Sequence, residues 1–66
     1  MQITMNGQSR HTTDGISLTE LVRQLSDRTS GIAVALNSEV VPRGSWAETT
    51  ISAGDRIDVV TAVQGG

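Results

Sequence analysis

Hydrophobic and polar residues alternate at the start of the chain, a pattern that is typical of a β-strand with one buried face. Residues 1–5 follow it, with Ile3 and Met5 on one face and polar side chains on the other. The Asn-Gly dipeptide at positions 6–7 then predicts a two-residue hairpin turn, because both positions of such a turn require a positive φ. Residues 8–12 are polar, so we expect them to return as an edge strand whose faces are mostly exposed to solvent.

The spacing of hydrophobic residues changes to that of a helix after position 17. Ser17 is a good N-cap, and Glu20 three residues later completes a capping box. The apolar residues that follow fall at i, i+3, i+4 and i+7, namely Leu18, Leu21, Val22 and Leu25. We expect this stripe to be the helical wall of the core, and we expect residues 29–31 to end the helix.

A second strand pair is predicted in the next segment. Residues 32–36 place large apolar side chains on one face and the small Ala33 and Ala35 on the other. A turn at 37–38 should lead into a short returning strand at 39–41, which a proline then ends because it cannot donate to a ladder.

The remaining segment contains the one aromatic residue and the last strand. Residues 43–50 read as irregular, and Trp46 within them should plug one end of the core with its N–H bonded to a carbonyl. We expect Ile51 to be anchored in the core, and residues 57–63 are mostly strand formers. One helix between two hairpins, with a last strand that must lie beside the first, predicts an α+β fold with the helix on one face of the sheet.

Composition narrows the possible functions. The 66 residues make one small domain without cysteine, so disulfides and thiolate metal sites are excluded. His11 has no partners at ligand spacing, and we expect it to be solvated. Five scattered arginines, one aromatic residue and a net charge of −2 argue against nucleic-acid binding. No segment has the length of a membrane span or the pattern of a signal peptide, so we expect a cytoplasmic protein with no membrane or nucleic-acid partner.

The chain ends on a segment with little bulk. Gln64 is followed by Gly65 and Gly66, which have no Cβ and could pass through a slot too narrow for any other residue. A frayed terminus is the simpler interpretation. Because the chain shows no nucleophile, base or metal constellation, the α-carboxylate of Gly66 is the only group suited to chemistry.

Several residues together resemble a known family. The chain is similar to the ubiquitin-like β-grasp proteins, and most of all to the ThiS family of sulfur carriers of thiazole (thiamine) biosynthesis. The resemblance covers essentially the whole chain and is carried by Ile3 with Asn6-Gly7, by residues 34–43 with their Val-Pro-Arg ending, by Trp46, by residues 54–57, and by Gly65-Gly66. Ser38 departs from the family, in which a glycine is common at this turn.

The resemblance implies a mixed β-grasp sheet in a domain at residues 1–63, followed by a flexible tail at residues 64–66. It implies a protein co-substrate and not an enzyme. An E1-like adenylyltransferase of the ThiF type would adenylate Gly66 with ATP, and a sulfur donor protein would convert the adenylate to a thiocarboxylate. A thiazole synthase of the ThiG type would take the sulfur, and the chain itself would bind no cofactor.

Recognition by these enzymes requires a docking face. If Ile57 and Val59 face the helix, the alternate residues of the last strand point outward, and we expect a shallow, mostly apolar face beside the tail, made of Thr4, Ala33, Ala35, Asp58, Val60 and Ala62. Two alternatives remain at this point. The chain could carry sulfur in another pathway, such as molybdopterin synthesis or tRNA thiolation, or it could be a passive ubiquitin-like interaction module.

Overall fold

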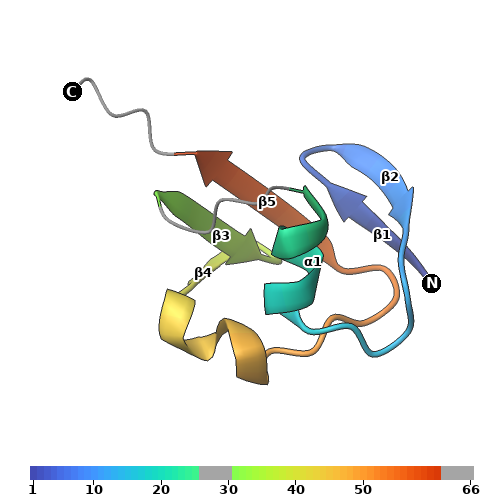
Figure 1. Cartoon of the computed structure of the whole chain (residues 1–66). Helices are drawn as coiled ribbons and strands as arrows, with labels where there is room; N and C mark the ends of the chain where they lie inside the picture. The colour runs from blue at the N-terminus through green and yellow to red at the C-terminus, as the bar shows by residue number, and fades with distance from the viewer. Residues whose placement is uncertain (26–30, 62–66) are drawn as a thin grey trace.

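The computed structural model describes residues 1–25 and 31–61, which form one sheet with a helix across one face (Figure 1). The elements in chain order are β1 (Gln2–Met5), β2 (Gln8–His11), α1 (Leu18–Leu25), β3 (Ile32–Leu36), β4 (Glu39–Val41), the 3₁₀ helix η1 (Arg43–Glu48) and β5 (Arg56–Thr61). The sheet order is β2-β1-β5-β3-β4. The predicted α+β arrangement is therefore confirmed.

The last strand lies in the middle of the sheet. β5 runs parallel to β1, with Met5 beside Ile57, and antiparallel to β3, with Ile32 beside Thr61. The expectation that the last strand lies beside the first is confirmed, and it makes the sheet mixed. β1 pairs with the first two residues of β5 and β3 pairs with the residues from Ile57 to Thr61, so every residue of β5 has a partner in at least one neighbouring strand.

Both hairpin turns have the backbone conformation that their sequences predict. Asn6 and Gly7 have φ values of 49° and 80°, and Asn37 and Ser38 have values of 51° and 72°. Asparagine enters this left-handed region more readily than most residues. Ser38 adopts it as well, so the serine that replaces the common glycine keeps the two-residue turn.

The helix begins as predicted. The backbone N–H of Glu20 donates to Oγ of Ser17 at 3.2 Å, which is half of the expected capping box. Leu18, Leu21 and Val22 are buried, and Leu25 packs half-buried against the same core. The predicted end of the helix at residues 29–31 lies largely outside the described residues.

The core lies between α1 and the sheet and is closed at one end by a tryptophan. Its buried members are Ile3, Met5, Ile16, Leu18, Leu21, Val22, Val34, Trp46, Ile51 and Ile57. Trp46 donates its ring N–H to the carbonyl of Val41 at 2.9 Å, as predicted. Ile51 is buried as expected, and His11 is exposed on β2.

Two features of the fold were not predicted. Residues 43–50 are not irregular, because Arg43–Glu48 forms η1; Pro42 has φ −58°, which suits a helix entry, and the Ser45 N–H donates to the Pro42 carbonyl at 2.8 Å. Ile16 is also part of the core. It is held there because the Ile51 N–H donates to its carbonyl at 2.9 Å, next to an isolated bridge between Ser17 and Thr50.

The described residues contain no helix long and apolar enough to cross a membrane.

Candidate functional site

The residues predicted to form a docking face are gathered on the side of the sheet opposite α1. Strand alternation and register place five of the six there, namely Thr4, Ala33, Ala35, Asp58 and Val60. The premise of that prediction is confirmed, since Ile57 is buried in the core and Val59 packs against it. Ala62, the sixth residue, lies outside the described residues.

The most apolar part of this face lies over β3, β4 and the end of β5. Val40 and Val60 are the exposed large hydrophobic residues of the described chain, at 71% and 62% exposure. Ala33 lies opposite Val60, and Ala35 lies opposite Val40. We call these four residues the valine patch. An exposed apolar cluster of this kind is typical of an interaction surface.

Sequence reasoning missed Val40. The signal was present, because a two-residue turn at Asn37 and Ser38 fixes the register of the hairpin. Leu36 then lies opposite Glu39, and Ala35 lies opposite Val40 on the outer face. The sequence predicted the strand at residues 39–41, but the prediction did not use its register to place Val40 on the outer face.

The part of the face near β1 is polar and not apolar. Arg56 and Asp58 form an ion pair with 3.2 Å between Nε and Oδ2, and Thr4 lies beside Arg56. The expectation of a mostly apolar face therefore holds over β3 and β4 but not next to β1. The outer face thus presents a charged half and an apolar half, and the apolar half is continuous with the end of β5.

The beginning of β5 is fixed by hydrogen bonds from the turn at Asn37. The Asn37 side chain accepts from the Arg56 N–H at 2.9 Å and donates to Oδ1 of Asp55 at 3.1 Å. Oδ2 of Asp55 accepts from the Ser52 N–H at 2.8 Å. This network holds the entry of the strand in a single geometry.

The first hairpin turn fixes the middle of β5 in a similar way. The Asn6 N–H donates to the Ile57 carbonyl at 2.9 Å, and the Asn6 side-chain carbonyl accepts from the Val59 N–H at 2.8 Å. The side chain of Asn6 thus continues the β1–β5 ladder past the point where β1 ends. β5, the strand that leads to the tail, is therefore held by hydrogen bonds along most of its length.

The tail itself lies outside the described residues, together with its predicted residues Gln64, Gly65 and Gly66. The last described residue, Thr61, still pairs with Ile32, so the ladder reaches to within five residues of Gly66. The described part of the chain contains no group of three His, Cys, Asp or Glu residues that could hold a metal ion. What the described structure supplies is a hydrogen-bonded central strand, next to the valine patch, that ends five residues before Gly66.

Comparison with known proteins gives consistent results. The ThiS family model matches residues 3–66. Over its full length of 66 residues the chain is 38% identical to the whole sulfur carrier protein ThiS of Escherichia coli K12. It is 29% identical to a segment of a thiazole synthase from Paramagnetospirillum magneticum; the match covers all of this chain and 20% of that protein.

The fold has a solved counterpart. The crystal structure of the thiamine biosynthesis protein ThiS from Geobacter metallireducens superposes with a TM-score of 0.87 at 29% sequence identity, and the match covers all of both chains. The likeness therefore extends over the helix and the whole sheet.

Proposed function

The chain belongs to the ThiS family, and from this premise we propose that it is the sulfur carrier of thiazole formation in thiamine biosynthesis, with the Gly66 carboxylate as the reacting group. The observation that carries the proposal is the combination of full-length family likeness with a Gly-Gly terminus beyond a clamped central strand. We propose that the protein acts as a co-substrate in the cytoplasm and is not an enzyme.

The chemistry starts from a group that is ionised and unreactive at neutral pH. An α-carboxylate has a reference pKa of about 3.3–3.7, so it carries a negative charge at pH 7 and is a poor electrophile. In the proposed first step a carboxylate oxygen of Gly66 attacks the α-phosphorus of ATP, and pyrophosphate leaves. The partner adenylyltransferase, of the ThiF type, supplies the site for this step.

The second step exchanges oxygen for sulfur. A nucleophilic sulfur at the oxidation level of sulfide, delivered by a sulfur donor protein, attacks the acyl carbon, and AMP leaves with the oxygen. The product is a thiocarboxylate on Gly66. Because the sulfur is bound to the terminus of the backbone, a carrier without cysteine can perform this task.

The proposed recipient of the sulfur is a thiazole synthase of the ThiG type. Support comes from the Paramagnetospirillum thiazole synthase, in which a segment similar to this entire chain forms part of the same polypeptide. We further propose that the valine patch, with the predicted Thr4 and Asp58 beside it, is the face on which the partner enzymes dock. It lies at the end of the strand from which the tail departs.

The proposal is tested first by mass spectrometry of the protein isolated from its own cells. A sulfur carrier should include a species heavier by the mass difference between sulfur and oxygen, located on Gly66. A passive interaction module would show only the carboxylate form. Accumulation of the sulfur-bearing form in cells that lack thiazole synthase, but not in cells that lack molybdopterin synthase, would identify the pathway.

The tail variants give a quantitative test. Deleting Gly66 leaves a carboxylate on Gly65 that is short by ~3.3–3.6 Å of reach. Such misplacement should lower ATP–pyrophosphate exchange by the cognate adenylyltransferase on the order of 100-fold. Adding one alanine after Gly66 should be as damaging, because the glycine carboxylate becomes a peptide carbonyl. Thermal unfolding should be nearly unchanged in both variants. Equal exchange rates in all three proteins would refute the carrier function.

A further inference from the structure

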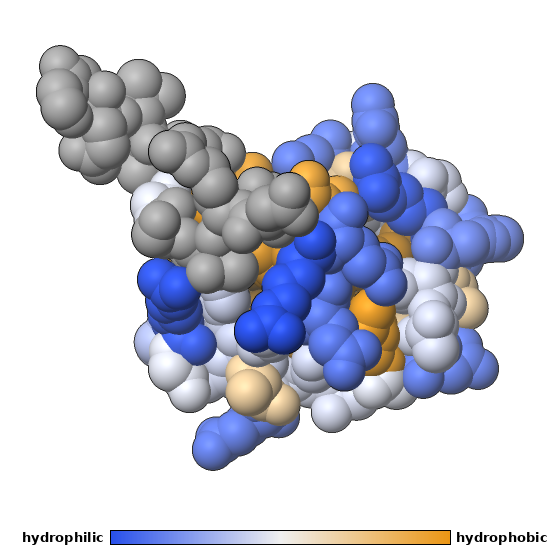
Figure 2. Space-filling model, in the orientation of Figure 1, coloured by the Kyte–Doolittle hydropathy of each residue, from blue (hydrophilic) through white to orange (hydrophobic). Residues whose placement is uncertain are grey.

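The molecule has a second recessed surface, on the side of the sheet that faces α1. Hydrophilic side chains cover most of this side, with hydrophobic ones visible between them (Figure 2). A pocket of about 230 Å³ opens here, which we call the helix-side pocket. Its lining comes from five separate elements and one turn, and consists of Met5, Asn6, Gln8, Arg10, Val22, Leu25, Ile32 and Val59.

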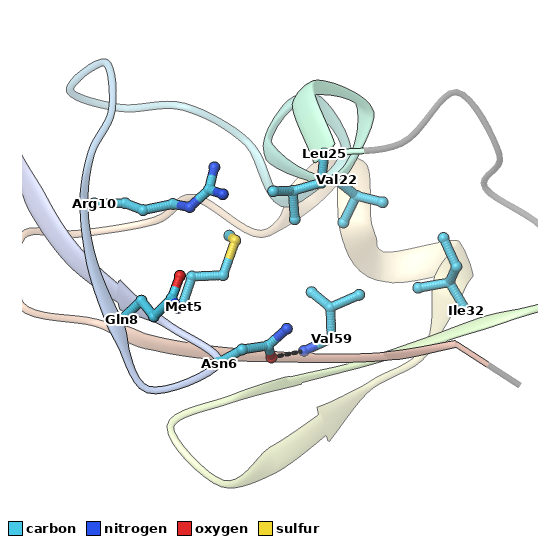
Figure 3. Close-up of a pocket in the computed structure, with 8 residues that line it drawn as sticks. All are labelled: Met5, Asn6, Gln8, Arg10, Val22, Leu25, Ile32 and Val59. Carbon is cyan, nitrogen blue, oxygen red and sulfur yellow. Dashed lines mark hydrogen bonds between the residues drawn. The ribbon is translucent and has the colours of Figure 1, made fainter.

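The pocket is lined by apolar side chains on one side and by the polar Asn6, Gln8 and Arg10 on another. Val22 and Leu25 of α1 lie across the space from Met5 and Val59 of the sheet (Figure 3). The side chain of Arg10 extends from β2 toward the same space (Figure 3). This arrangement suits a ligand with a hydrophobic body and an anionic group beside it.

The charges around the pocket also favour a ligand with an anionic group. No Asp or Glu is among the described residues that line the pocket. The ion pairs of the N-terminal amine with Asp14 and of Arg56 with Asp58 do not involve Arg10. A guanidinium with no carboxylate partner among residues 1–25 and 31–61, beside the apolar side of a pocket, offers a specific place for a carboxylate.

The position of the pocket relates it to the tail. Val59 lines the pocket, and its neighbour Val60 belongs to the valine patch on the opposite face. Ile32 also lines the pocket and pairs with Thr61, the last described residue of β5. A partner that holds the tail therefore meets the valine patch on one side of the strand and the helix-side pocket on the other.

We infer that the helix-side pocket is a second docking site for the adenylating enzyme, which inserts a hydrophobic side chain there and pairs an adjacent acidic residue with Arg10. This inference rests on the proposed function. The chain's own tail is the competing occupant, with Val63 and the terminal carboxylate as its matching groups. Folding back would order five residues to bury one β-branched side chain, so backbone entropy favours the partner enzyme.

A charge reversal at Arg10 tests the ionic half of the inference. The exposed Arg10→Glu should leave the thermal unfolding midpoint unchanged and raise the KM for the carrier in ATP–pyrophosphate exchange roughly 10-fold, with kcat unchanged. The increase should shrink at high salt, because the pair is screened. Arg23→Glu, on the exposed face of α1, is the matched control with the same change in net charge and should behave as wild type.

Methyl NMR tests the apolar half. Adding the adenylating enzyme without ATP should shift the methyl signals of Val22, Leu25 and Val59. If those signals stay in place while the Val60 methyls shift, docking uses the outer face alone and the inference is wrong. If removing residues 62–66 shifts them in the absence of enzyme, the tail occupies the pocket and the inference is equally wrong.

Different results would contradict the proposed function and the helix-side docking site. A wild-type protein that supports no pyrophosphate exchange would contradict the proposed function. A wild-type protein that supports exchange, together with an Arg10→Glu variant of unchanged KM, would contradict the helix-side docking site alone.

Discussion

Val59 and Val60 are adjacent in β5 and have identical side chains, but they lie on opposite faces of the sheet. Val59 packs against the core and lines the helix-side pocket, whereas Val60 is 62% exposed on the outer face. The difference follows from the two-residue period of a strand. In a domain of 66 residues, one central strand therefore supplies the core with one set of side chains and the outer surface with the next.

The two faces should respond differently to substitution. At core positions on the helix side that do not line the helix-side pocket, removing apolar volume should lower the free energy of unfolding and leave recognition of the folded protein unchanged. On the outer side, a change should weaken binding and leave stability unchanged. Substitutions on each face test this separation.

The largest effect is expected inside the core. Leu21→Ala removes a buried side chain of α1 and should lower the free energy of unfolding by about 2–5 kcal/mol. This is a large share of the total for so small a domain. Urea denaturation followed by circular dichroism measures the loss, with Gln24→Ala on the exposed face of the helix as control. A loss under ~1 kcal/mol would mean that Leu21 is not a core residue.

The next effect concerns the outer face. Val60→Asp should leave the unfolding midpoint nearly unchanged, because the side chain is already exposed, and should weaken binding to the adenylating enzyme about 10-fold, or ~1.4 kcal/mol. Ala47→Asp, an exposed position on η1, makes the same charge change away from the sheet. Titration calorimetry on both variants measures the difference. If Val60→Asp unfolds the protein, the two faces of β5 have been assigned the wrong way round.

Much of the fold could be predicted because the signals are local. Strand alternation around Ile3 and Met5, the Asn-Gly turn and the capping box at Ser17 each specify structure over a few residues. The burial of Trp46 and its hydrogen bond to a carbonyl followed from the chemistry of a single side chain. In each of these interactions the residues are close in the sequence as well as in space.

The parts that were missed depend on contacts between distant segments. Ile16 belongs to no periodic pattern of hydrophobic residues. It is held in the core by the Ile51 N–H, which donates to the Ile16 carbonyl from a distant part of the sequence. The helix-side pocket is built from β1, β2, α1, β3 and β5 together, so no single stretch of sequence contains it. Five of the six residues predicted for the outer face lie there, and Ala62 is outside the described residues. Val40 was missed because its place requires the register of β3 and β4.

A smaller effect on stability is expected at the turn that holds the entry of β5. Asn37→Ala removes two side-chain hydrogen bonds and places alanine at φ 51°, so it should lower the free energy of unfolding by about 2 kcal/mol. Asn37→Gly can still adopt the positive φ of the turn and should lower the free energy of unfolding by only about 1 kcal/mol. Thermal melts of the two variants separate the conformational effect from the hydrogen bonds. Equal losses would show that backbone conformation contributes little.

The smallest effect is expected for the ion pair on the outer face. Arg56 and Asp58 are 3.2 Å apart, but the Arg56 side chain is 61% exposed and that of Asp58 is 31% exposed. Exposed pairs of this kind contribute about 0.2–1 kcal/mol, because solvent screens the attraction and ordering two side chains costs entropy. A double-mutant cycle with Arg56→Ala and Asp58→Ala, measured by urea denaturation, isolates the coupling. It should fall toward zero at ~1 M salt, where the Debye length is about 3 Å. A coupling above ~2 kcal/mol that persists in salt would show that the charged half of the outer face stabilises the fold, and the separation between the two faces of β5 would then not hold.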